Sequence, residues 1–252
     1  MERRRLKADL YALVSPELER MGFLAAFTER TGGVSRGPFS SLNLGSETGD
    51  HPDLVGENRR RVGGALGTRE PVSARQVHGT RLHPVEGPVS DVVSPVADAD
   101  GLTTRAAGVP LAVMVADCVP LVLASGAEEL LAAVHVGWRG LAAGIVQIAV
   151  RSFSGPASVA ASIGPSVGPC HYEVGQEVVE QVLAGTEGGA VVARGGSGPR
   201  LDLASSVEAV LGGLGVRTVD RAGECTACDP VRFFSHRRDG TTGRQALVAM
   251  RL

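Results

Sequence analysis

The chain has 252 residues, of which 43% are hydrophobic and 21% charged, and its formal net charge is −2. This composition is typical of a globular protein with a sizeable core, and the near-neutral charge argues against nucleic acid as a partner. The longest apolar run, 109–124, contains Pro110, Asp117 and Pro120 and so should not span a membrane. The N-terminal segment has no signal-peptide core, and the four cysteines indicate reduced thiols in a cytoplasmic protein.

The first two-thirds of the chain is rich in strand-forming sequence. Continuous runs of apolar and β-branched residues are typical of strands that are covered on both faces. On this basis we expect strands, in chain order, at residues 22–30, 72–77, 109–116, 119–125 and 129–136.

Beyond residue 137 the apolar residues recur at helical spacing, up to a stop at Gly155-Pro156. Two more helices are expected at 174–183 and 203–214, the second with Asp202 as its N-cap. The segment 185–200 is rich in glycine and is expected to be a surface excursion, and 244–252 alternates as a closing strand. The prediction is one mixed α/β domain over residues 1–252, with 1–20 as an N-terminal extension.

Three side chains suited to zinc lie at expected strand ends. Cys118 and His135 are 17 residues apart, and a hairpin-like return would bring them together. His78 ends another strand and is followed by Gly79. One thiolate and two imidazoles match the ligand preferences of zinc and leave a fourth position open, as in catalytic sites. The alternative is a buried free cysteine with two hydrogen-bonded histidines.

Cys225 and Cys228 form the only CxxC pair. A structural zinc there would need two further ligands, for which Cys170-His171 or His236 are the only candidates. A redox pair normally begins a helix, which Asp229-Pro230 disfavours. We therefore interpret both thiols as structural residues without a metal.

Other polar residues interrupt apolar sequence or follow it. Asp117, beside Cys118, either acts as a general acid or caps the turn. Arg139 stands at an expected helix start, where its guanidinium and the free backbone amides suit a phosphate. Arg59 and Arg237 are further candidates, and a solvated surface position is the alternative for every one of these arginines.

Several motifs occur in the order found in one family, from about Phe23 to the C-terminus. They include QVHG (76–79), ADGLTT (99–104), ADCVPLVL (116–123), HVGWRGL (135–141) and FFSHRRDGTTGR (233–244). The chain thereby resembles the laccase-domain (YfiH-like) family, also called multicopper polyphenol oxidoreductases and now described as purine nucleoside phosphorylases. Val136 and His236 stand where this family usually has Ala and Tyr.

The resemblance implies a single-domain α/β sandwich, similar to the toxin domain of cytotoxic necrotising factor. It also implies that zinc is held by His78, Cys118 and His135. The implied reaction is phosphorolysis of adenosine, inosine, guanosine and methylthioadenosine with phosphate as co-substrate, together with deamination of adenosine at the same site.

The expected catalytic residues are Asp117, Arg59 and Arg139. Asp117 would protonate the leaving purine and the two arginines would hold phosphate, while a zinc-bound hydroxide would attack C6 of adenine in deamination. Sugar or phosphate contacts are expected from the side chains Asn43, Ser35 and Arg237.

Two other functions stay open. Copper-dependent oxidation of phenols, the older description of the family, is disfavoured because the chain has only six histidines and no HxH pairs. A non-catalytic zinc-binding factor linked to peptidoglycan fidelity would need a fourth protein ligand, and His83 and Cys170 are poorly placed for that role. The sequence leaves the preferred nucleoside and the oligomeric state open.

Overall fold

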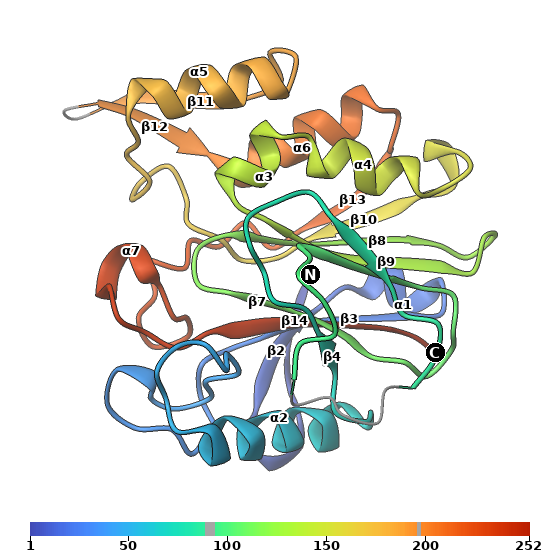
Figure 1. Ribbon diagram of the computed structural model, residues 1–252, viewed down its shortest axis with the longest axis vertical. Coiled ribbons are helices and arrows are strands. Elements are labelled where there is room, and N and C mark those ends of the chain that lie inside the picture. Colours follow the sequence, from blue (N-terminus) through green and yellow to red (C-terminus); the bar gives the residue numbers. More distant parts are fainter. Residues whose placement is uncertain (89–93, 196–197) are drawn as a thin grey trace.

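Two mixed sheets pack face to face, and helices cover both outer faces, in the computed structural model (Figure 1). It describes residues 1–88, 94–195 and 198–252. The first six-stranded sheet has the order β1 (Glu2–Arg5), β2 (Tyr11–Val14), β3 (Phe23–Thr28), β14 (Gln245–Arg251), β7 (Leu111–Val115), β4 (Val72–Ser73). The second has the order β13 (Thr218–Arg221), β10 (Ala160–Ile163), β8 (Val119–Ser125), β9 (Leu130–Val136), β6 (Gly101–Thr104), β5 (Leu82–Pro84).

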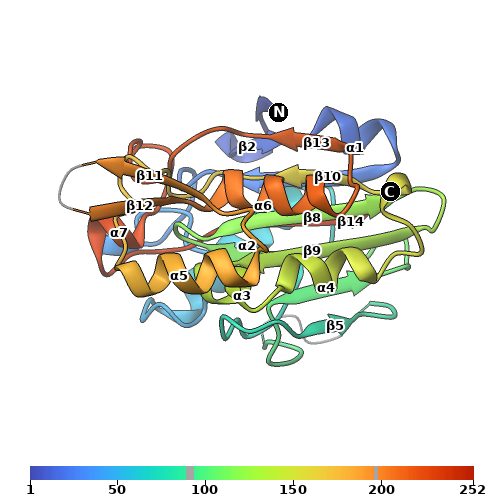
Figure 2. The ribbon, with the colours of Figure 1, turned by 90° about the horizontal axis from the view of Figure 1, so that it is seen from above.

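The helices lie on opposite sides of the paired sheets. Above the second sheet, as Figure 2 shows, lie α3 (Trp138–Ala142), α4 (Ile145–Arg151), α5 (Gln176–Gly185) and α6 (Leu203–Gly213). Helix α2 (Pro52–Leu66) covers the first sheet on the other side (Figure 1). The remaining elements are the short helices α1 (Pro16–Arg20) and α7 (His236–Asp239), the hairpin of β11 (Val191–Gly195) and β12 (Gly198–Asp202), and the 3-10 helices η1 (Lys7–Asp9), η2 (Gly37–Phe39) and η3 (Pro156–Ser158).

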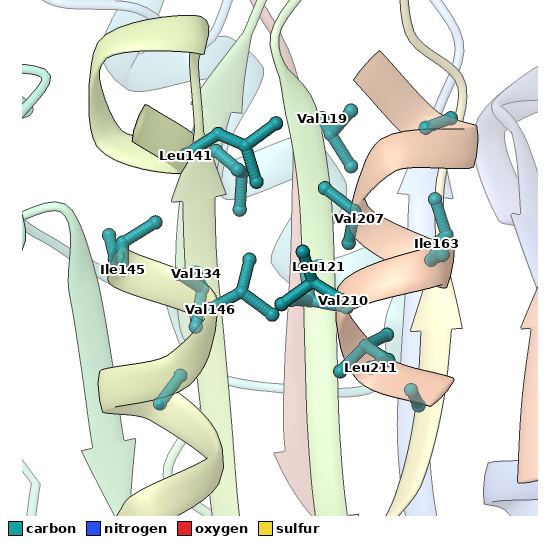
Figure 3. Packing of buried hydrophobic residues seen from close by; sticks show 14 of the residues in the cluster. Val119, Leu121, Val134, Leu141, Ile145, Val146, Ile163, Val207, Val210 and Leu211 are labelled. Atoms are coloured by element: carbon teal, nitrogen blue, oxygen red, sulfur yellow. The ribbon is translucent and has the colours of Figure 1, made fainter. Parts of the chain in front are cut away.

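Alternation along the central strands builds two cores. In β8, Leu121 and Leu123 pack against the helices, while Val122 and Ala124 face the first sheet. Figure 3 shows Leu121 among side chains of α4 and α6, including Val146 and Val210. Because both faces of this strand are buried, its sequence is continuously apolar, as the sequence analysis assumed.

Most predicted strands are confirmed to within a few residues, but the strand expected at 72–77 is shorter. It ends at Ser73, and Gln76 then takes over the pairing through its side chain. Its Nε2 donates to the carbonyl of Met114 at 2.7 Å, and its Oε1 accepts from the Met114 N–H at 2.8 Å. The chain therefore leaves the sheet without losing its anchor on β7.

The helical segment after residue 137 is two helices. Gly144, at φ +85°, separates α3 from α4 and redirects the chain in a conformation that favours glycine. Helix α6 begins as predicted, with the Asp202 side chain accepting from the Ser205 N–H at 2.9 Å. Helix α5 is the helix expected at 174–183, displaced by two residues.

Two segments contain more structure than expected. The loose excursion predicted at 185–200 holds most of the β11–β12 hairpin, and its residues 196–197 lie outside the described part of the chain. Within the expected extension 1–20, β1 and β2 continue the first sheet beyond β3. None of the helices in the described ranges is both long and apolar enough to cross a membrane.

Leu121→Ala should destabilise the fold by about 2–5 kcal/mol, because it removes a fully buried side chain and leaves a cavity between β8 and the helices. Leu183→Ala is the matched control, since this leucine of α5 is 38% exposed. Urea unfolding followed by circular dichroism measures both. Equal losses of unfolding free energy would contradict the assignment of Leu121 to the core.

Candidate metal centre

Cys118 lies where the chain crosses from one sheet to the other. Strand β7 of the first sheet ends at Val115 and β8 of the second begins at Val119. Within the crossing, Asp117 has φ +97°, a value that residues other than glycine rarely adopt. Its carboxylate accepts from the Thr226 hydroxyl and from the Arg237 N–H, each at 2.6 Å. These bonds hold the strained turn that presents the thiol.

His135 reaches the same place through a hairpin. Strands β8 and β9 are antiparallel and pair Val119 with Val136, which confirms the predicted return of the chain toward Cys118. His135 shares the strand face of Leu131 and Ala133, which is turned toward the first sheet. The imidazole is therefore presented between the sheets, beside the crossing.

Asp100, directly before β6, organises two of the three donors. Its Oδ1 is 2.9 Å from Nδ1 of His135, and its backbone carbonyl accepts from the His135 N–H at 2.7 Å. Its carboxylate also accepts the backbone N–H groups of Val77, His78 and Gly79 at 3.2, 2.9 and 2.7 Å. Since Nδ1 of His135 is engaged, Nε2 is left as the metal-binding atom.

His78 completes the cluster from the loop that follows β4. Its backbone is in the left-handed region, at φ +59°, where the bonds to Asp100 hold it. Nε2 of His78 is 3.9 Å from Sγ of Cys118, and the rings of His78 and His135 lie edge to face with centroids 4.8 Å apart. The three candidate ligand atoms all lie within 4.8 Å of one another.

The charges of this cluster favour a metal ligand. Burial alone would raise the pKa of Cys118, but the charge and hydrogen bond of His135, with a smaller contribution from His78, lower the pKa to about 6. Burial opposes the charged form of His135, yet Cys118 and Asp100 raise its pKa to about 9. The thiol is thus stabilised as a thiolate, the form that binds metal, and a bound cation would replace the imidazolium proton.

The small size of residue 137, a glycine, also supports a metal site at these three donors. A side chain at Gly137 would place a Cβ 2.8 Å from Cδ2 of His78 and 3.3 Å from Sγ of Cys118, so only glycine leaves the donors room. In tetrahedral zinc coordination a sulfur and a nitrogen lie roughly 3.5 Å apart, close to the separation of Cys118 and His78. The donor set therefore fits a metal ion held by three protein ligands.

A cavity of about 440 Å³ opens onto the three donors, a size typical of small-molecule sites. Arg59, Arg139 and Arg244 line it, together with Glu47 and His236. Burial lowers the pKa of Arg59 and of Arg244, opposed in each case by nearby acidic groups. Charged guanidinium groups that are largely buried favour an anionic ligand, because charges attract more strongly where water is excluded.

The other expected site residues are outside this lining. Both oxygens of Asp117 are bonded within the protein, and the Arg237 guanidinium lies over the Tyr172 ring, 5.0 Å from its centroid. Ser35 donates to Asp50 at 2.6 Å, and Asn43 accepts from the Arg244 N–H at 2.8 Å. The contacts of Asn43 fix the backbone at Arg244.

Sequence reasoning gave no role to Asp100 or to Arg244. Both stand in motifs that carry the family resemblance, ADGLTT and FFSHRRDGTTGR, so the signal was present without an assigned chemistry. Their roles depend on distances between segments that are far apart in the chain, 35 residues in the case of Asp100 and His135.

Two features define the class of this protein. Two mixed sheets pack face to face, and one cysteine and two histidines lie in the wall of a cavity that arginines line. The family model described as multi-copper polyphenol oxidoreductase laccase matches residues 24–252. The chain therefore belongs to this family.

The relatives agree with the match. A Shigella flexneri protein named purine nucleoside phosphorylase YfiH is 39% identical over 229 residues, which cover 89% of this chain and 92% of the relative. A Streptomyces coelicolor protein, also named a purine nucleoside phosphorylase, is 41% identical over 226 residues, 87% of this chain and 92% of the relative.

Solved structures share the fold. The hypothetical protein YfiH of Bacillus licheniformis superposes with a TM-score of 0.86 at 31% identity and covers 98% of both chains. YlmD of Geobacillus stearothermophilus gives 0.83 at 35% identity and covers 91% of this chain and 92% of that one. These matches support the single-domain mixed α/β architecture.

Asp100→Asn should weaken zinc binding by about 10–100-fold, because an amide cannot stabilise His135 and the three backbone N–H groups as the carboxylate does. Asp98→Asn is the matched control, since the Asp98 carboxylate is exposed and forms a surface ion pair with Arg75. Competition with a chromophoric chelator measures the affinities. Equal affinities for the two variants would contradict the role given to Asp100.

Proposed function

We propose that this protein is a zinc-dependent purine nucleoside phosphorylase. The observation that carries the proposal is a cluster of three metal-binding donors, His78, Cys118 and His135, in the wall of a cavity that three arginines also line. The names of the curated relatives support the reaction class. The proposed substrates are adenosine, inosine, guanosine and methylthioadenosine, with phosphate as the second substrate.

Zinc is proposed over copper because the chain has six histidines and no HxH pairs, the pattern that multicopper sites need. One thiolate and two imidazoles are ligands that zinc accepts, and when bound the ion would polarise a substrate atom or lower the pKa of water. The ligands would be His78, Cys118 and His135. A reduced thiolate ligand also supports the cytoplasm as the place of action.

The arginines would bind phosphate and hold it against the sugar. Arg59 is 96% buried and donates from Nε to the Leu44 carbonyl at 3.0 Å, so its position is fixed. Arg244 is fixed by bonds to the carbonyls of Thr242 and Gly243 at 2.9 and 3.0 Å. Arg139 is exposed at the rim, where it stacks on Trp138. Two preorganised cations and a third at the rim would stabilise the dianion as it attacks C1′.

Protonation of the leaving purine falls to His236 in this proposal. Its ring lines the cavity, and Nδ1 lies 2.6 Å from the Gly240 carbonyl, which fixes the imidazole. Asp117 is proposed as a positioning residue, because both of its oxygens already accept bonds from Thr226 and Arg237. Ser35 and Asn43 would likewise support the cavity wall, and Arg237 would contact substrate only at the outer edge.

Adenosine deamination belongs to the proposal as a second activity of the same cavity. It needs an activated water in place of phosphate and a proton donor for the leaving ammonia. The vacant metal position and His236 support both requirements. Release of ammonia from adenosine without phosphate would identify this activity.

Purified zinc-loaded protein should release hypoxanthine and ribose 1-phosphate from inosine only when phosphate is present. His78→Ala should lose the metal and reduce kcat/KM at least about 100-fold, because a two-ligand site holds zinc weakly. His83→Ala, which changes a histidine outside the donor cluster, is the control. Zinc-loaded protein that turns over no purine nucleoside would overturn the proposal, and phenol oxidation by the copper form would favour the older family description.

Arg244→Gln should raise the KM for phosphate about tenfold or more, with a smaller effect on the KM for inosine, because it removes a charge from the cavity wall. Arg36→Gln, at an exposed position outside the cavity lining, should leave both constants unchanged. Initial rates at varied phosphate measure the effect. If the KM for phosphate were unchanged in Arg244→Gln, Arg244 would not be part of the phosphate site.

A further inference from the structure

A second set of metal-binding side chains lies outside the cavity. Cys170 and His171 stand in the loop before α5, and Cys225 and Cys228 in the loop before α7. One donor atom from each of the four lies within 4.8 Å of all the others. We propose that these residues form a second, structural zinc site that joins the two loops. From the sequence alone, a metal at this CxxC pair is disfavoured, because its further ligands lie far away in the chain.

The distances fit tetrahedral coordination. Sγ of Cys170 is 3.5 Å from Sγ of Cys225 and 3.5 Å from Sγ of Cys228. Nδ1 of His171 lies 3.3, 3.9 and 3.4 Å from the sulfurs of Cys170, Cys225 and Cys228. Bonds of about 2.3 Å to sulfur and about 2.0 Å to nitrogen require edges of roughly 3.8 Å between sulfurs and roughly 3.5 Å between sulfur and nitrogen. One ion therefore fits all four donors.

The backbone holds both ligand pairs in tight turns. The Cys228 N–H donates to the Cys225 carbonyl at 3.2 Å, and the His171 N–H donates to the Gly168 carbonyl at 3.0 Å. The Gly168 N–H points at Sγ of Cys225 at 3.1 Å, a bond that stabilises a ligating thiolate. Such turns are typical of structural zinc sites, which use C-x2-C spacing.

The two loops are already aligned. Ser166 and Cys225 form an isolated parallel bridge, in which the Thr226 N–H donates to the Ser166 carbonyl at 3.0 Å. These backbone hydrogen bonds bring the two loops together, and the ion would fix the four ligand side chains that project from the loops. Hydrogen bonds between thiols would explain single pairs, but a set of four mutually close donors is the geometry of a metal site.

The positive charge near the four donors also favours a zinc site there. Zinc with three thiolates and one neutral imidazole carries a net charge of about −1. Arg200 donates to the Cys170 carbonyl at 2.9 Å, and Arg238 donates to the carbonyl of Thr226 at 2.9 Å, between the two cysteines of the pair. The Arg200 guanidinium is therefore placed to offset the negative charge of the complex, whereas Arg238 is also paired with Asp239 at 2.6 Å.

The proposed site has a mechanical link to the candidate metal centre. Thr226, which lies between the ligands Cys225 and Cys228, donates its hydroxyl to Asp117 at 2.6 Å. Asp117 is the neighbour of Cys118. A zinc that fixes the loop at 225–228 would thereby also fix the turn that presents the Cys118 thiol, although an ion with four protein ligands would have no position for substrate.

The test separates the two sites with Cys118→Ser, which removes the only thiolate of the candidate metal centre. Reduced wild-type protein should bind about two zinc ions per chain and Cys118→Ser about one. Cobalt(II) added to Cys118→Ser should give the intense sulfur-to-metal charge-transfer absorption of a tetrahedral site with three thiolates. Neither measurement uses enzymatic activity, so neither depends on the proposed function.

His171→Ala in the Cys118→Ser background should weaken metal binding at least about tenfold, and His83→Ala in the same background should not. His171 is exposed, so its truncation leaves the core intact, and circular dichroism verifies the fold of each variant. Zinc should also raise the unfolding temperature of the Cys118→Ser protein. Reduced Cys118→Ser protein that binds no zinc, or cobalt absorption too weak for three thiolates, would overturn the proposal. A disulfide involving Cys170 that persists under reducing conditions would overturn it as well.

Discussion

The carboxylate of Asp100 is the constraint on which the candidate metal centre depends. It joins a strand end of the second sheet, at His135, to the loop that leaves the first sheet, at His78. This carboxylate is buried together with the imidazole, with side-chain exposures of 0% and 4%. Burial opposes its charge, but the bond to His135 and the N–H groups of Gly79 and His78 outweigh it and lower the pKa of Asp100. The donors are therefore positioned by the protein before any ion arrives.

The two candidate metal-binding clusters differ in the number of their donors and in their surroundings. The centre formed by His78, Cys118 and His135 has three donors, and its cavity carries arginines that suit an anion. The cluster of Cys170 and the CxxC pair has four donors and no vacant position. An ion with three ligands can act on a substrate, whereas an ion with four protein ligands serves the fold.

The apolar strands could be predicted from sequence because they depend on local pattern, and the proximity of His78, Cys118 and His135 could be expected because each stands at an expected strand end. A buried strand such as β8 is continuously apolar, and a ligand placed at its end stands out against that background. A metal at the second cluster was considered from sequence and disfavoured, because no sequence pattern shows that Cys170 and Cys225, 55 residues apart, are brought together beside a bridge at Ser166. The edge strand β1 escaped for another reason: its four residues include no apolar side chain, so it carries no periodic signal.

The sequence also indicated which residues belong near the site better than it indicated what each of them does. Asp117 was expected either to donate a proton or to cap a turn, and the structure shows a carboxylate whose two oxygens are bonded to Thr226 and Arg237. The distinction depends on which way a side chain points at a crossing between sheets. No spacing rule describes that direction, since it is set by a residue more than 100 positions away in the chain.

The pairing of β8 with β9 has a consequence for how the chain folds. Val119 lies opposite Val136, and along β9 the imidazole of His135 alternates with valines that pack under the helices. If the pairing slipped by one residue, this imidazole would point into the apolar core beneath the helices, and the two neighbouring valines would leave that core. Misaligned hairpins would thus carry a desolvated, unpaired ring, so the same histidine that equips the site also penalises wrong alignments during folding.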